Sequence, residues 1–81
     1  MTTPKLVRVE PREDYALAVT FENGERRVFS LAPYLDLPVF RPLRDPARFR
    51  EVALQGAWAV EWPGEVDIHR DTLYLEGLPE R

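Results

Sequence analysis

The sequence predicts a single small α+β domain in which a three-stranded antiparallel meander is followed by a short helix and a C-terminal β-hairpin. Two observations indicate this fold. Strand-forming runs alternate with strong turn signals in the first third of the chain, and an Asp-Pro pair marks a helix start near its middle. A chain of 81 residues can bury one hydrophobic core and is too short for two. We therefore treat residues 1–81 as one domain.

Three runs rich in strand-forming residues occupy positions 6–9, 15–21 and 26–31. Pro11 removes a backbone donor and Asp14 can bond its own following backbone, which predicts a chain reversal between the first two runs. Asn-Gly separates the second run from the third. This pair is preferred at the centre of a two-residue type I′ turn, because both positions need positive φ. The sequence therefore predicts an antiparallel hairpin.

The expected turn also predicts the register of this hairpin. With a two-residue loop at positions 23–24, Phe21 lies opposite Arg26, and Val19 lies opposite Val28. Directly opposed residues share one face of a sheet. One face would then carry Tyr15, Leu17, Val19, Phe21 and Val28, and the other would carry Ala16, Ala18, Phe29 and Leu31. Because both faces are partly apolar, we expect something to cover each of them.

The middle of the chain, residues 32–45, is rich in proline and also apolar. This composition predicts an irregular segment with one helical turn at 32–35, and we expect the segment to pack as a lid on the sheet. Asp45-Pro46 predicts the start of a short helix over 46–52, with a capping carboxylate followed by proline at the first helical position. Two further strands are expected at 52–54 and 57–62. For residues 65–77 the pattern leaves two alternatives open, a strand at 73–75 or a helical turn capped by Asp71.

The charge and cysteine content narrow the class of protein. Fourteen acidic and 11 basic residues give a net charge of -3, so there is no electrostatic reason to expect a nucleic-acid backbone as partner. The one locally basic stretch, residues 41–50, lies within an acidic chain, and nucleic-acid binding through this domain alone is not expected. The absence of cysteine excludes disulfides and thiolate zinc sites, and it is compatible with a reducing cytoplasm. The longest nearly apolar run, 15–21, is far shorter than a membrane span.

The search for catalytic or metal-binding residues yields one candidate group. Asp67, His69 and Asp71 would share a face if they lay on a strand, but His69 is the single histidine of the chain. No nucleophile motif or phosphate-binding glycine loop is present in the sequence. We therefore predict no catalytic residue, no cofactor and no metal site. The alternative is a small ligand-binding protein or enzyme that uses the region of Asp67, His69 and Asp71.

The two tryptophans suggest a contact surface. Trp58 and Trp62 lie four residues apart in the expected strand 57–62, so their side chains share one face of it. There they either fill the hydrophobic core or contact a partner protein. Trp62 ends this strand before Pro63-Gly64, so we expect it to be the more accessible of the two. Phe29 and Leu31, on the second face of the predicted hairpin, complete the candidate partner interface.

An ordered set of features resembles a family of short bacterial proteins known as domain of unknown function 2442. The resemblance spans nearly the whole chain and rests on Val7-x-Val9-x-Pro11, Asp14-Tyr15-x-Leu17-x-Val19-x-Phe21-x-Asn23-Gly24-Glu25, Phe29-Ser30-Leu31, Phe40-x-x-Leu43-x-Asp45, Phe49-x-x-Val52, Trp62-Pro63-Gly64-x-x-Asp67-Ile68 and Leu73-Tyr74. It implies a compact α+β fold and supplies no catalytic residues. It also implies genes that neighbour another small protein, which suggests toxin–antitoxin pairs.

Together, composition and resemblance predict a cytoplasmic, non-enzymatic protein-binding or regulatory module, the antitoxin-like half of a two-protein system. The expected partner is another small protein or a second copy of the chain, and neither a membrane nor a cofactor is expected. The assignment to a binding role depends on analogy with the family, because fold alone does not imply function.

Overall fold

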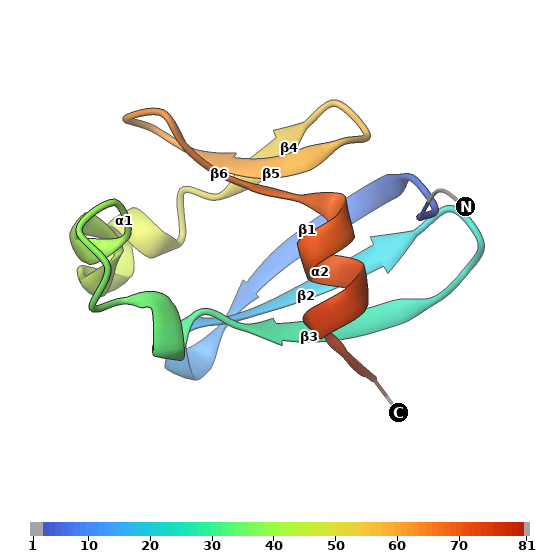
Figure 1. Ribbon diagram of the computed structural model, residues 1–81, viewed down its shortest axis with the longest axis horizontal. Coiled ribbons are helices and arrows are strands. Elements are labelled where there is room, and N and C mark those ends of the chain that lie inside the picture. Colours follow the sequence, from blue (N-terminus) through green and yellow to red (C-terminus); the bar gives the residue numbers. More distant parts are fainter. Residues whose placement is uncertain (1–2, 81) are drawn as a thin grey trace.

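Seven strands and two α-helices organise the computed structural model, which describes residues 3–80 (Figure 1). Three short 3₁₀ turns, η1 (Glu13–Tyr15), η2 (Ala32–Tyr34) and η3 (Arg41–Arg44), connect them. The strands are β1 (Leu6–Arg12), β2 (Ala16–Phe21), β3 (Arg26–Ser30), β4 (Ala53–Gln55), β5 (Ala59–Trp62), β6 (Val66–His69) and β7 (Leu78–Pro79), and the helices are α1 (Pro46–Phe49) and α2 (Arg70–Glu76).

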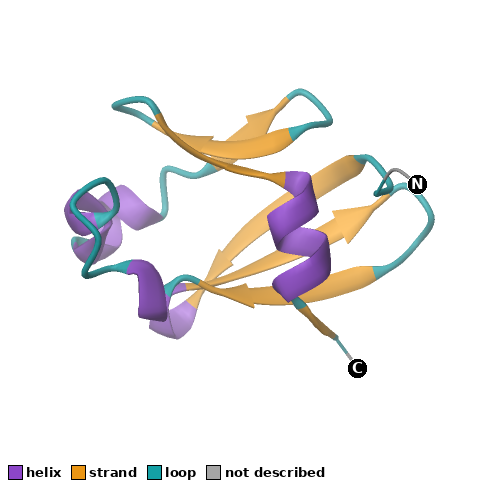
Figure 2. Cartoon of the chain, viewed as in Figure 1, coloured by secondary structure: helices purple, strands orange, loops and turns teal. Residues whose placement is uncertain are grey.

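The strands form two antiparallel sheets that face each other across the core. One sheet has the order β1-β2-β3-β7 and the other β4-β5-β6. In Figures 1 and 2 the smaller sheet lies above the larger one, and α2 crosses in front of the space between them. The buried cluster draws on both sheets, on α2 and on the middle segment; it comprises Leu6, Leu17, Val19, Phe21, Phe29, Leu31, Leu43, Phe49, Val60, Trp62, Val66, Ile68 and Leu73.

The predicted meander is present, but the predicted register of its second hairpin is wrong by one residue. Val19 pairs with Arg27, and Val28 pairs with Ala18. The Phe21 amide donates to the Glu25 carbonyl at 2.9 Å, so the loop contains three residues rather than two. Of these only Gly24 has positive φ, at 88°. A three-residue loop that ends in a left-handed glycine is the next most common hairpin connection after the two-residue turns.

This shift moves every side chain of β3 to the opposite face. Phe29 therefore lies opposite Leu17 on the core face, and Val28 joins the alanines on the outer face. Phe29 and Leu31 are both buried. The expectation of two apolar faces is thus wrong, because the large apolar side chains of β2 and β3 gather on one face.

The outer face of the larger sheet is lined by charged side chains instead of a protein layer. Arg8, Glu10 and Arg12 of β1 pair with Thr20, Ala18 and Ala16 and so share their face. Ion pairs link these charged residues with one another and with Arg26 through Glu80; the pairs are Arg8–Glu10, Glu10–Arg12, Arg12–Glu80 and Arg26–Glu80. Long charged side chains can cover small residues such as Ala18 with their stems while their heads stay in water.

The middle segment closes one end of the core. Its predicted helical turn is η2, and Leu43 of η3 is buried. Asp45 caps α1 as predicted, since its side chain accepts from the Ala47 amide at 3.0 Å. The Trp62 indole donates to the Phe49 carbonyl at 2.8 Å, which ties α1 to the smaller sheet.

The C-terminal third differs from the predicted hairpin. Strands β4 and β5 are joined by a third strand, β6, and the open alternative for residues 65–77 resolves into β6 followed by α2. The N-cap of α2 is His69, whose Nδ1 accepts from the Asp71 amide at 3.1 Å, and not Asp71 itself. After α2 the short strand β7 pairs with β3 and extends the larger sheet.

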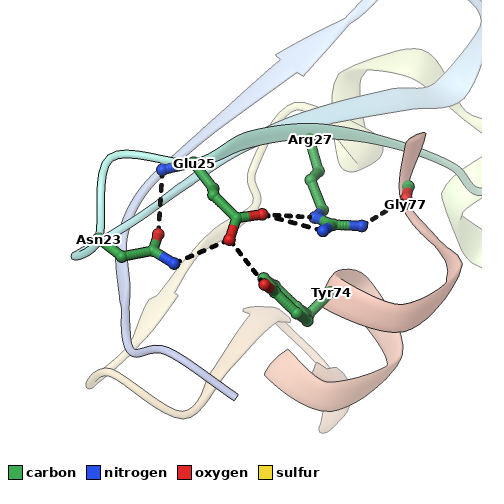
Figure 3. Close-up of polar contacts among 5 residues, drawn as sticks. All are labelled: Asn23, Glu25, Arg27, Tyr74 and Gly77. Carbon is green, nitrogen blue, oxygen red and sulfur yellow. Dashed lines mark hydrogen bonds and ion pairs between the residues drawn. The ribbon is translucent and has the colours of Figure 1, made fainter. Parts of the chain in front are cut away.

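A polar network fastens α2 to the β2–β3 hairpin (Figure 3). The Glu25 carboxylate accepts from the Tyr74 hydroxyl at 2.7 Å, from Arg27 Nη2 at 2.9 Å and from Asn23 Nδ2 at 2.9 Å. Arg27 lies 4.1 Å above the Tyr74 ring centroid and donates to the Gly77 carbonyl at 3.3 Å. Hydrogen bonds from Tyr74 and then from Arg27 hold the pKa of Glu25 below its ordinary value.

Across residues 3–80, neither helix has the length and apolar character needed to cross a membrane.

Replacing Gly24 by valine is expected to lower the free energy of unfolding by about 1–3 kcal/mol, because a β-branched residue resists positive φ. A Cβ at Gly24 would meet no atom within 4 Å, so the loss comes from the backbone and not from a clash. Gly24→Asn should cost less, since asparagine tolerates the left-handed region. Urea unfolding measures both, and a valine variant as stable as the parent would contradict the loop geometry.

Replacing Glu25 by glutamine should destabilise the protein at neutral pH, and this difference from the parent should disappear on acidification. The folded-state pKa of Glu25 is depressed, so its contribution is complete above its unfolded pKa of about 4.3 and is lost as the pH falls through the folded value. Thermal melts from pH 7 to about pH 3 measure this convergence. Glu22→Gln, at an exposed position of the same loop, is the matched control. A pH-independent gap would be evidence against the network.

Candidate functional site

A pocket of about 210 Å³ opens between the two sheets, where β3, β6, α2 and the middle segment meet. We call it the aromatic pocket; its lining residues are Phe29, Tyr34, Phe40, Asp67, Ile68, His69 and Thr72. In Figure 1, β6 of the smaller sheet runs directly into α2, which lies in front of the larger sheet. The pocket therefore brings together residues that are up to 43 positions apart in the chain, from Phe29 to Thr72.

Three aromatic rings form the apolar part of the pocket and fix one another. Tyr34 stacks on Phe29 with ring centroids 5.7 Å apart and an interplanar angle of 22°, and Phe40 meets Tyr34 edge-on at 6.2 Å. The Tyr34 hydroxyl donates to the Glu76 carboxylate at the end of α2. This hydrogen bond raises the pKa of Tyr34 above its ordinary value, so the phenol stays protonated at neutral pH.

The polar part of the pocket comes from β6 and the first turn of α2. Asp67 and His69 are two residues apart on β6 and are both exposed, while Ile68 between them is buried. His69 also caps α2, because its Nδ1 accepts from the Asp71 amide. Thr72 adds a hydroxyl from α2. The site therefore combines an apolar floor with hydrogen-bonding groups at its rim, as ligand pockets usually do.

The predicted group of Asp67, His69 and Asp71 converges only in part. Asp67 and His69 line the aromatic pocket, whereas the Asp71 carboxylate accepts from the Thr3 hydroxyl and lies 3.6 Å from His69 Nδ1. In the described part of the chain, no group of three His, Cys, Asp or Glu side chains is arranged to hold a metal ion.

Of the four residues of the predicted partner interface, only Trp58 reaches the surface. Its side chain is 55% exposed, whereas Trp62 is 2% exposed and Phe29 and Leu31 are buried. The expectation that Trp62 is the more accessible tryptophan is therefore wrong. Trp62 is the last residue of β5 and lies opposite Val66, whereas Trp58 lies in the turn before β5.

Trp58 rests on a buried arginine. The Arg70 guanidinium carbon lies 4.5 Å from the Trp58 ring centroid, and Arg70 is 7% exposed. Nε and Nη1 of Arg70 find no hydrogen-bond partner among residues 3–80. A desolvated guanidinium on a tryptophan face contributes about 2 kcal/mol of attraction, which holds the indole in place.

The sequence reasoning missed Tyr34, Phe40 and Arg70. Tyr34 and Phe40 were expected only as parts of an apolar lid, and their spacing in an irregular, proline-rich segment carries no period that could assign them to a site. In the sequence Arg70, between His69 and Asp71, looks like a solvated residue, and only the structure shows that it is buried against Trp58.

Comparison with known proteins gives one match. No curated protein and no solved structure is similar to the chain. The model of a protein family described as a protein of unknown function, DUF2442, matches residues 6–78, the region that holds strands β1 to β6, α2 and the aromatic pocket. The chain therefore belongs to the DUF2442 family, as its ordered sequence features suggested.

Proposed function

We propose that the chain is a non-enzymatic protein-binding module whose contact surface is centred on Trp58. The observation that carries this proposal is that Trp58 is 55% exposed while its ring lies against the buried Arg70. Tryptophan is enriched among the residues that dominate binding energy at protein interfaces. A ring that is already fixed loses little conformational entropy when a partner covers it.

The partner in this proposal is a small protein encoded beside this one, or a second copy of the chain, and the chain is the antitoxin-like half of such a pair. The family resemblance motivates this regulatory role. The compartment we propose is a bacterial cytoplasm, with which the cysteine-free sequence is compatible.

The second candidate function is the binding of a small ligand in the aromatic pocket. Its support is the position of Asp67 and His69 beside three aromatic rings in one cavity. Asp71 faces away from this cavity toward Thr3, so the support extends to binding and not to chemistry that needs all three residues.

Trp58→Ala should weaken the complex with the co-expressed neighbouring protein by at least about tenfold, because removal of an interface anchor commonly costs 2 kcal/mol or more. Isothermal titration measures the affinity, and Trp58→Phe, which keeps a ring over Arg70, should lose less. Leu78→Ala, another exposed apolar residue on the far sheet, is the matched control and should bind normally.

If the partner is a second copy, sedimentation should show a dimer that Trp58→Ala converts to a monomer. Acrylamide should quench the fluorescence of Trp58 in the free protein and less in the complex, while the buried Trp62 stays protected throughout. A chain that is monomeric, captures no co-expressed neighbour and keeps Trp58 open to quencher would overturn the proposal.

A further inference from the structure

We propose that the aromatic pocket binds the side chain of an arginine or lysine presented by a partner polypeptide. The inference deepens the proposed function by naming the side chain that the partner supplies, and it concerns a surface other than that of Trp58. Size, apolar floor, charge and ring chemistry of the pocket each favour a long basic side chain.

The size of the pocket suits one side chain. Its volume of about 210 Å³ is below the range of roughly 300–1,000 Å³ that is typical for drug-sized ligands. The buried Phe29 and Ile68 form an apolar floor. Arginine and lysine carry an aliphatic stem that can cover such a floor while the charged head remains among polar groups.

The charge around the pocket is negative. Asp67 lines it directly, and Glu76 accepts from the hydroxyl of the lining Tyr34. No lysine or arginine is among the lining residues. Carboxylates at the mouth of a low-dielectric hollow attract a cation and raise its local concentration.

The two arginines that directly follow pocket residues in the sequence already contact other groups. Arg41 follows Phe40, and its Nε donates to the Asp36 carbonyl at 3.3 Å. Arg70 follows His69 and stacks on Trp58. Neither arginine therefore supplies a cation to the pocket, and a cation that binds its carboxylates and aromatic rings must come from another source.

The aromatic rings add a second attraction for a cation. A cationic head within about 6 Å of a ring centroid is attracted by the electron density of the ring face. In the described part of the chain the same contact occurs twice, with Arg27 at 4.1 Å from the Tyr74 ring and Arg70 at 4.5 Å from the Trp58 ring. The rings of Phe29, Tyr34 and Phe40 have no such cation among residues 3–80.

The pocket is also ordered before any ligand enters. Tyr34 is held by Phe29 on one side and by Glu76 at its hydroxyl, and His69 is held by the amide of Asp71. A pre-ordered site loses less entropy on binding, which favours recognition of a single side chain.

The test uses N-acetyl-arginine amide and N-acetyl-lysine amide as probes, with the uncharged N-acetyl-citrulline amide and N-acetyl-norleucine amide as matched analogues. In amide NMR spectra the cationic probes should shift the resonances of residues 67–72, with a Kd of about 1 mM, as expected for a single side chain. The uncharged analogues should bind about tenfold more weakly. Norleucine amide binding as tightly as the cations would overturn the assignment.

Substitutions in the pocket test where the probes bind, and they separate the contribution of the carboxylate from that of the aromatic rings. Asp67→Asn should weaken the cationic probes several-fold without changing the binding of the uncharged analogues, and Phe40→Leu should weaken the cationic probes. Tyr34→Phe keeps the ring but loses its hydrogen bond to Glu76, so it should weaken the cationic probes less than Phe40→Leu does. Glu10→Gln removes a carboxylate from the outer face of the other sheet and should have no effect. Absence of shifts at residues 67–72, or cation binding unaffected by Asp67→Asn, would refute the inference.

These outcomes are independent of Trp58. If the cationic probes fail while Trp58→Ala still disrupts the protein complex, the pocket inference is wrong and the proposed function stands. If the probes bind while no protein partner contacts Trp58, the proposed surface is wrong and the pocket remains a site for a basic group.

Discussion

The three-residue loop between β2 and β3 is the constraint on which the rest of the structure depends. Gly24 adopts a positive φ of 88° and places Phe29 opposite Leu17. With this register the bulky side chains of both strands point to one side of the sheet, where the smaller sheet and α2 cover them. A shift by one residue would send Phe29 to the face that carries Arg8 and Arg12, since side chains alternate strictly along a strand.

The second layer follows from this single apolar face. Trp62 and Ile68 of the smaller sheet, and Leu73 of α2, bury their side chains in the same cluster. Helix α2 has only seven residues and would not form alone, so it depends on this contact and on the polar network around Glu25. Because Glu25 follows Gly24 directly, the loop that aligns the sheet also presents the carboxylate that anchors Tyr74.

The aromatic pocket arises where these layers end. Phe29 is placed there by the hairpin register, Asp67, Ile68 and His69 by β6 at the edge of the smaller sheet, and Thr72 by the start of α2. The middle segment supplies Tyr34 and Phe40, because its prolines prevent a regular strand that would carry them across the core. Trp58 precedes the Ala59–His69 pair of β5 and β6, and it is exposed while its ring lies over the buried Arg70.

The sequence alone was sufficient to predict those elements that depend only on residues close together in the chain. The meander, the Asp45 cap of α1 and the turn at Pro63-Gly64 each depend on a few adjacent residues, and each could be predicted from them. The family could also be recognised, since an ordered set of such signals extends along the chain. What the tertiary structure alone decided was the register of the β2–β3 hairpin, the burial of Trp62 and Arg70, and the convergence of Phe29, Tyr34 and His69 on one pocket. Asn-Gly is compatible with loops of two or three residues, and burial of Phe29 in the core shared with the second sheet selects the three-residue loop.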